Sequence, residues 1–388
     1  MLKINRNSLF TLLASFSILA ACSDDDSPTG LRPKMEYTSL NDEKAYSVQF
    51  LDVTGLTTVD STEGNTYHKM FQAHNYYSSS STSANAEIDA VKLNNLFSNS
   101  GNPFVDISTS TISVNGATLN ASGLNLRDIT ASSLTDGSDV IEKIESHFDK
   151  LADASLSIGE VAEAGQAGKL GNYLVDERGI EHIQIIQKSL IGALELDYIG
   201  NVLLSEGLDA DNSKVVTGKN YTALEHNWDV AYSLLTLNPV YLAGSTDATR
   251  GTTEFGLGAY TWEYNKANYA NMFAAFLKGR AAIVNNDKAE LEKQALFIRT
   301  QFEIALAKAA LGYLDKWKTG TTDAARAHAI GEGLGFIYSL RFATVHTVDA
   351  TFSDELMDDL IGSENGFWDL TADKINAASD AINDKFDF

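Results

Sequence analysis

Three ionisable side chains, Glu225, His226 and Asp229, lie close together in a segment whose apolar residues have helical spacing. At 100° per residue, Asp229 projects about 40° from Glu225 and about 60° from His226, so all three share one face of the helix. A histidine with a carboxylate three residues later can bind a metal ion or relay a proton. The alternative is an ordinary carboxylate–imidazole pair on a helix surface.

A second pair, His328 and Glu332, lies four residues apart in another predicted helix. Residues at this spacing share a face, as two ligands of one ion must. The run Tyr-Ser-Leu begins six residues after His226 and again six residues after Glu332, which is weak evidence that two related helices face each other. We therefore expect one inter-helix metal site formed by His226, Asp229, His328 and Glu332. Glu225 would be a further ligand or would orient an imidazole.

Imidazole and carboxylate ligands without a thiolate suit iron, zinc or manganese and do not choose among them. The run Asp209–Ser213 begins like a calcium loop, but Lys214 takes the position that needs glycine and Asn220 that of the bidentate Glu. We therefore interpret it as a solvated loop. The sequence has no HExxH helix, GxSxG elbow or P-loop. No established catalytic motif therefore decides the function.

Three alternating aromatic residues, Tyr260, Trp262 and Tyr264, have two interpretations. They form a ledge on which a sugar stacks, or they form an aromatic lid packed on a helical bundle, which is the commoner arrangement. The other histidines have no obvious partner in the sequence, and we expect them to be structural or exposed: His68, His74, His147, His182 and His346.

The elements that must position these residues are mostly helices. From residue 136 onward, apolar residues recur at i, i+3, i+4 and i+7. Asp287 is a suitable N-cap and Gly320 a suitable C-terminal stop. Short loops between such helices favour antiparallel bundles, two of them side by side. The predicted helices cover 140–154, 176–205, 221–237, 265–284, 287–319, 322–344, 353–361 and 371–386.

The preceding part, residues 36–135, is rich in Ser, Thr, Asn and Gly and is expected to be less regular. Short helices are predicted over 67–77 and 87–99. Weak alternation over 106–122 includes Asn115-Gly116, a strong short-range hairpin signal. We therefore expect a small β-hairpin there, and one mainly α domain over 36–388 that comprises this irregular part and the helical bundles of 136–388.

Composition excludes several classes of protein. The 388 residues include 52 acidic and 29 basic side chains, a formal net charge of −23, which disfavours nucleic acid and anionic bilayers as electrostatic partners. Hydrophobic residues make up 44%, enough for a packed core and too many for a disordered chain. The single cysteine, Cys22, excludes an internal disulfide, a zinc ribbon and an iron–sulfur centre.

The N-terminus has the pattern of a secretory signal over residues 1–21. Lys3 and Arg6 precede a short apolar run that is too short to span a membrane. Leu19-Ala20-Ala21-Cys22 resembles the bacterial lipobox, which predicts acylation of Cys22 and a mature chain that begins there. A signal peptide that merely contains a cysteine is the alternative. Residues 22–35 would be the acylated cysteine and a flexible tether, and lipid chains anchor such a protein without spanning the bilayer.

Several stretches resemble an uncharacterised bacterial lipoprotein family allied to the imelysins. The likeness is best over roughly 170–345 and looser in the N-terminal third. The stretches that carry it are Tyr173–Asp176, Gly179–Glu181, Lys188–Ala193, Tyr221–Asp229, Phe276–Arg280 and Gly333–Arg341.

This resemblance implies an all-α fold of two helical bundles in a secreted or lipid-anchored protein associated with iron uptake. Some imelysin-like proteins are classed as metallopeptidases, and their signature is GxHxxE. If His226 matches that histidine, Leu224 replaces the glycine and Asp229 the glutamate. Asp229 is one methylene shorter and could still ligate, but the departure puts peptidase activity in doubt.

The expected function is that of a non-enzymatic, outer-membrane-anchored lipoprotein of the cell envelope. It would bind iron, zinc or a metal-bearing ligand between its bundles and act with iron-uptake components. An imelysin-type metallopeptidase with Glu225 as general base is one alternative. A surface lipoprotein that binds glycan or protein without metal is another.

Overall fold

The computed structural model describes residues 31–235 and 255–388. The expected signal peptide, Cys22 and most of the tether lie outside these residues. Helices dominate, and the strands found in the described ranges form two short antiparallel pairs, so the mainly α fold is confirmed. In the same ranges, no helix is both long and apolar enough to cross a bilayer.

The N-terminal part is more helical than expected, because α1 runs for 22 residues. The predicted hairpin exists, but its strands pair Ile107 with Val114 and Ser108 with Ser113, so Asn115-Gly116 is not its turn. Asn115 instead caps a helix, accepting a hydrogen bond from the Thr118 N–H. The elements are η1 (Tyr37–Ser39), η2 (Tyr46–Val48), α1 (Thr62–Ser83), α2 (Ala90–Ser98), β1 (Ile107–Ser108), β2 (Ser113–Val114), α3 (Gly116–Asn120) and α4 (Leu126–Ile129).

The larger part of the chain contains the long helices. Asp287 caps α11 by accepting from the Glu290 N–H, and Gly320 ends that helix, as the sequence predicted. The elements are α5 (Ser138–Ser155), β3 (Gly168–Leu170), β4 (Tyr173–Val175), α6 (His182–Leu190), η3 (Ile191–Leu203), η4 (Glu206–Asp209), α7 (Ala223–Leu235), α9 (Leu257–Tyr264), η5 (Lys266–Asn268), α10 (Tyr269–Asn285), α11 (Lys288–Thr319), α12 (Asp323–Ser339), η6 (Leu340–Phe342), α13 (Ala350–Ile361), η7 (Gly366–Asp369) and α14 (Ala372–Phe386).

The segment predicted as one helix over 176–205 begins with a turn and then forms two helical elements, α6 and η3. Asp176 accepts hydrogen bonds from the N–H groups of Arg178 and Ile180, and Gly179 has φ +74°, so residues 176–181 form a tight turn after β4. The helix begins only at His182. From Ile191 to Leu203 it continues as a π-helix, η3. The turn therefore places Asp176 beside the first residue of α6.

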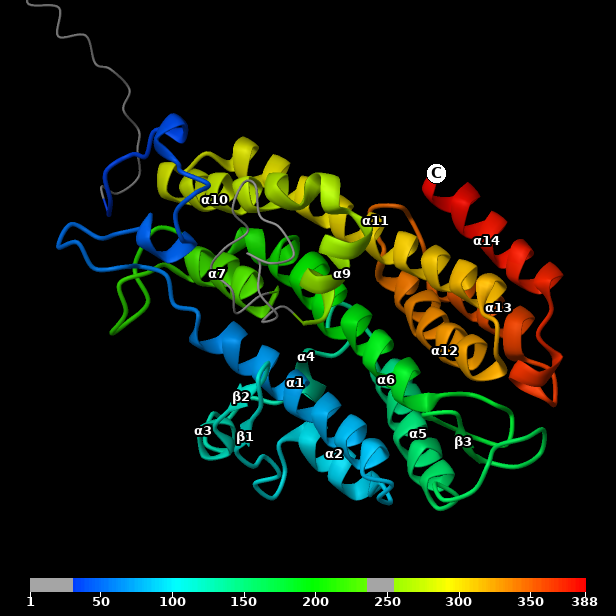
Figure 1. Cartoon of the computed structure of the whole chain (residues 1–388). Coiled ribbons are helices and arrows are strands. Elements are labelled where there is room, and N and C mark those ends of the chain that lie inside the picture. Colours follow the sequence, from blue (N-terminus) through cyan, green and yellow to red (C-terminus); the bar gives the residue numbers. More distant parts are fainter. Residues whose placement is uncertain (1–30, 236–254) are drawn as a thin grey trace, which may run out of the picture.

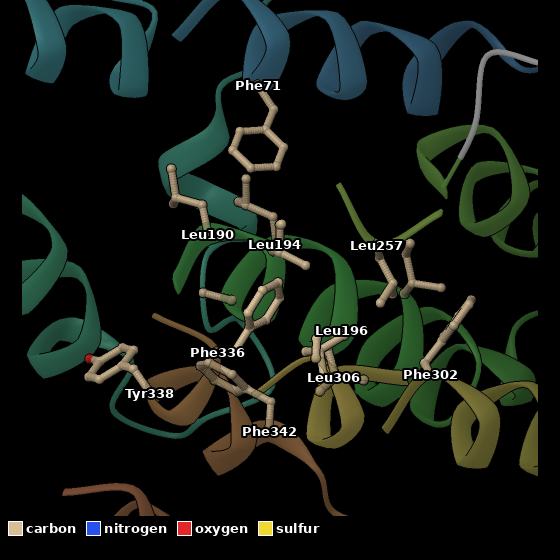
Figure 2. Packing of buried hydrophobic residues seen from close by; sticks show 14 of the residues in the cluster. Phe71, Leu190, Leu194, Leu196, Leu257, Phe302, Leu306, Phe336, Tyr338 and Phe342 are labelled. Carbon is tan, nitrogen blue, oxygen red and sulfur yellow. The ribbon is translucent and has the colours of Figure 1, made fainter. Parts of the chain in front are cut away.

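The α6–η3 segment runs through the middle of the molecule. It lies between α1, α2 and α5 on one side and α10, α11 and α12 on the other (Figure 1). α6 packs against α5 and α12, α1 against α7, and α11 against α10 and α12. Figure 2 shows Leu190 and Leu194 of this segment beneath Phe71, with Phe336, Phe342 and Leu306 on the opposite side. The buried residues of these helices form one continuous core.

Candidate functional site

The predicted ligand Asp229 and its neighbour Glu225 are fully buried and contact arginine. Arg280 of α10 donates Nη1–H to Glu225 at 2.7 Å and Nε–H to Asp229 at 3.0 Å. Arg32 also pairs with Glu225, and Tyr46 donates its hydroxyl to Asp229 at 2.7 Å. Burial raises the pKa of Asp229, although Arg280 and Tyr46 oppose the shift. The two carboxylates therefore belong to a buried ion network that ties α7 to α10 and to the N-terminal segment.

Trp228 completes the contact between the same two helices. Its indole N–H donates to the carbonyl of Phe276 at 2.9 Å, and its ring lies against Gly279, where a Cβ would overlap it. We call these contacts, together with those of Arg280 to Glu225 and Asp229, the α7–α10 clasp. The clasp joins two of the stretches on which the family resemblance was based, and it gives both a packing role.

His226 has partners of its own. Its Nε2 lies 3.1 Å from Glu63 of α1, and its ring stacks on Tyr221 with centroids 4.8 Å apart. A shallow cavity of about 740 Å³ adjoins this pair and is also lined by Asp60 and Lys219. The Nδ1 atom of His226 is buried and has no hydrogen-bond partner in the described part of the chain. His226 thus faces α1, whereas Asp229 faces α10.

His328 and Glu332 do lie in one polar cluster. His328 Nδ1 is 2.8 Å from Glu181, and Glu332 pairs with the buried Lys188 at 3.0 Å. Burial would lower the pKa of His328, but Glu181 and Glu332 outweigh it and raise the pKa. The ring of His328 also stacks on Tyr173 with centroids 4.0 Å apart.

The four predicted metal ligands thus have carboxylate, ammonium or guanidinium partners within the protein. Across residues 31–235 and 255–388, no three His, Cys, Asp or Glu side chains are arranged to hold a metal ion. The inter-helix metal site stays a prediction, and its residues are explained by the ion pairs that they form.

The aromatic run Tyr260, Trp262 and Tyr264 packs against other aromatic side chains. Trp262 is 6% exposed and meets Tyr269 edge-on, with centroids 4.7 Å apart. Tyr260 packs against Phe336 at 4.6 Å, and Tyr264 lies 6.1 Å from Tyr313. This arrangement agrees with the lid interpretation and not with an open stacking ledge.

A larger cavity, of about 970 Å³, is lined by α5, the 176–181 turn, α6, the end of α12 with η6, and α13. We call it the α5 cavity. Arg178 fixes the turn to the end of α13 by donating to the carbonyls of Ile361 and Ser363, the latter at 2.8 Å. Arg341 pairs with Asp354 at 2.6 Å and so links η6 to α13. The volume of the α5 cavity is typical of a small-molecule site, and the contacts of Arg178 and Arg341 hold its walls together.

A chain of hydrogen bonds connects three side chains of the α5 cavity. His182 Nε2 lies 2.9 Å from Asp176 Oδ2, and His182 Nδ1 lies 2.9 Å from His147 Nδ1. Burial would raise the pKa of Asp176, but His182 and the Ile180 and Arg178 N–H groups lower it. Burial, His182, Lys150 and Lys143 together hold the pKa of His147 well below its ordinary value.

Sequence reasoning missed these residues, because it treated His147 and His182 as having no partner. Part of the signal was visible. Lys143, His147 and Lys150 occupy positions i, i+4 and i+7 of one predicted helix, which places them on one face. The contact between His147 and His182 spans 35 residues and depends on how α5 packs on α6, so spacing could not reveal it.

A family model described as a domain of unknown function (DUF4856) matches residues 46–388. No curated protein and no solved structure matches the chain.

Proposed function

This chain belongs to the DUF4856 family, and we propose that it is a lipid-anchored cell-envelope protein that binds a small polar ligand in the α5 cavity. One observation carries the proposal: a cavity of about 970 Å³ holds the buried Asp176–His182–His147 chain beside Lys143 and Lys150. Ligand sites in proteins combine such a volume with a few convergent polar groups and titratable side chains of shifted pKa.

The anchor and the location in this proposal rest on the sequence. The lipobox-like Leu19-Ala20-Ala21-Cys22 supports acylation of Cys22 and attachment to the outer membrane. Kinship to the imelysins, and with it the iron ligand and the iron-uptake partners, rests on the resemblance of short stretches. The geometry favours the α5 cavity over those stretches, because two of them form the α7–α10 clasp.

A peptidase mechanism with Glu225 as general base has less support. A general base needs a lone pair within reach of water. Glu225 is fully buried, and its Oε1 accepts from Arg280 while its Oε2 accepts from the Thr222 N–H at 2.8 Å. Both oxygens are therefore occupied by partners within the protein.

A screen of small polar metabolites by thermal shift and calorimetry tests the proposal. Ala167 lines the α5 cavity, so the indole of the Ala167→Trp variant would take up space in it. The affinity of every ligand that binds there should fall at least about tenfold, or 1.4 kcal/mol. Ala164→Trp is the matched control, because Ala164 is exposed on the same loop and does not line the cavity. Equal affinity in both variants, or no ligand at all, would contradict the proposal.

A further inference from the structure

The hydrogen-bond chain in the α5 cavity has a fixed direction. An ionised Asp176 only accepts, so His182 must carry its proton on Nε2 and, in the neutral pair, has a lone pair on Nδ1. His147 must then donate from Nδ1, which leaves the lone pair of its Nε2 as the free end of the chain. Neutral His147 can therefore only accept a hydrogen bond at Nε2, which we call its outer nitrogen.

One added proton turns the outer nitrogen of His147 from a hydrogen-bond acceptor into a donor. It binds at His147 Nε2, and the proton between the two Nδ1 atoms then shifts to either ring. When it lies on His182, the positive charge is adjacent to Asp176 at 2.9 Å. In both arrangements His147 presents an N–H at its outer nitrogen, so the pair takes up one proton and becomes a charged donor.

Two lysines flank this outer nitrogen on α5. Lys143 and Lys150 lie four residues before and three residues after His147, and all three line the cavity. Neither lysine forms an ion pair with any residue of the described ranges, and both are exposed. The two lysines therefore favour an anion beside His147, although acidic side chains line the cavity as well, and an anion would in turn favour the protonated histidine pair.

The cavity also has apolar lining residues from α6, α12 and α13. Tyr338, Met357, Ile361 and Ile185 contribute to its lining. The cavity is also far larger than a bare inorganic anion requires, since a water-sized site occupies only about 30 Å³. A ligand with an apolar body behind a charged head would have the room it needs and would contact these apolar residues.

We infer that the α5 cavity binds an oxyanion, a carboxylate or phosphate head on an apolar body, between Lys143, His147 and Lys150, and that binding brings one proton onto the His147–His182 pair. This inference rests on the proposed function and names the ligand class of the same cavity. Binding consumes one anion and one proton and forms no covalent bond.

Other charges face the pair from each packed element. Asp354 is paired with Arg341, and Asp176 keeps its negative charge while it accepts from the Arg178 and Ile180 N–H groups and from His182. The groups that most affect the pKa of His147 after burial are His182, Lys150 and Lys143, all of which lower it. An anion removes this repulsion. The titratable and charged groups that line the cavity are Asp139, Lys143, Lys150 and Asp153 on α5, Asp176, Glu177 and Arg178 in the turn, His182 on α6, Tyr338 on α12, Arg341 on η6, and Asp354 and Asp358 on α13.

Calorimetry on the purified mature chain tests the inference with three probes: phenylacetate, phenyl phosphate and the neutral 2-phenylethanol. We expect at least one anion to bind ten or more times tighter than the alcohol. Phenylacetate has no titrating group near pH 7, so its binding enthalpy in two buffers of different ionisation enthalpy reports proton uptake. Because the pKa of His147 lies well below its ordinary value before binding, that uptake should be measurable and should rise as the pH of the titration is lowered from about 7.5 to about 6.

Two sets of variants separate the parts of the inference. Lys143→Gln/Lys150→Gln should weaken anion binding about tenfold, whereas Lys214→Gln/Lys293→Gln, with the same charge change outside the cavity, should not.

In Asp176→Asn, Oδ1 keeps the two backbone donors and the amide donates to His182. The chain then runs in the opposite direction and His147 presents an N–H without a proton from solvent. This variant should bind phenylacetate with little proton uptake.

Two results would overturn the inference. One is anion binding that the lysine substitutions leave unchanged or that takes up no proton in the unaltered protein. The other is equal binding of the alcohol and the anions, or no binding of either anion at 10 mM or below. If the alcohol binds and Ala167→Trp abolishes that binding, the proposed function stands while the oxyanion inference fails.

Discussion

At the scale of single residues, the buried ion network of Arg280 decides how Glu225 and Asp229 are to be understood. Both carboxylates and the guanidinium are fully buried. Buried charges persist only where partners compensate for lost hydration, and here Tyr46 and Thr58 supply further hydrogen bonds. Burial and the nearby Arg280 also lower the pKa of Arg32, which meets the same Glu225, to about 10.

We predict that Arg280→Met lowers the free energy of unfolding by about 3–5 kcal/mol, because it leaves Asp229 buried without a cation. Urea denaturation followed by circular dichroism measures this loss. Lys278→Met, on the same helix, removes a partly exposed pair with Glu290 and should cost no more than about 1 kcal/mol. Equal losses in the two variants would contradict a structural role for the network.

At the scale of elements, helix contacts depend on glycines where side chains would collide. Gly279 of α10 faces the ring of Trp228 on α7, and Gly192 of η3 faces Ser339 of α12. Ser339 donates to the carbonyl of Lys188 at 2.7 Å, which the close approach permits. These positions bring α7 onto α10 and α6–η3 onto α12, and other residues of α6 and α12 line the α5 cavity.

Two glycine substitutions should act in opposite directions. Gly279→Ala forces the indole of Trp228 to move and should cost about 1–3 kcal/mol of stability. Gly333→Ala, inside α12, places its Cβ at 3.5 Å from Tyr313, an ordinary contact, and should add up to about 1 kcal/mol because alanine favours helix. Thermal unfolding of both variants measures the difference. A stabilising Gly279→Ala would show that α7 and α10 do not meet in this way.

At the scale of the whole molecule, the buried residues form one core and the chain carries a large excess of acidic side chains. With residues 1–21 removed, 27 basic and 52 acidic side chains leave a formal charge of 27 − 52 = −25. Attachment to a membrane would therefore depend on the lipid expected at Cys22.

We predict that Cys22→Ala moves the chain from the membrane fraction to the soluble fraction of envelope preparations, because no acyl chain remains to partition. Ser23→Ala is the control and should stay with the membranes. Fractionation followed by immunoblotting measures both. Membrane association that survives Cys22→Ala would contradict the lipid anchor.

The sequence by itself determined the local features. Helical spacing gave the mainly α fold, and the residue types at Asp287 and Gly320 located the ends of α11, because capping depends on neighbours within a few residues. The hairpin was found for the wrong reason, since Asn115-Gly116 begins a helix instead of turning a strand. The predicted common face of Glu225, His226 and Asp229 holds for the two carboxylates, which both contact Arg280, but not for His226, which contacts Glu63 of α1.

Only the tertiary structure decided which partner each charged group meets. Glu225 and Arg280 are 55 residues apart, and His147 and His182 are 35 apart. Spacing within a helix fixes a side chain's face, but it says nothing of the helix that covers that face. Because α7 packs on α10, the candidate metal ligands Glu225 and Asp229 form a buried ion network with Arg280. The packing of α5 on α6 joined two histidines without evident partners into a chain that ends in a cavity.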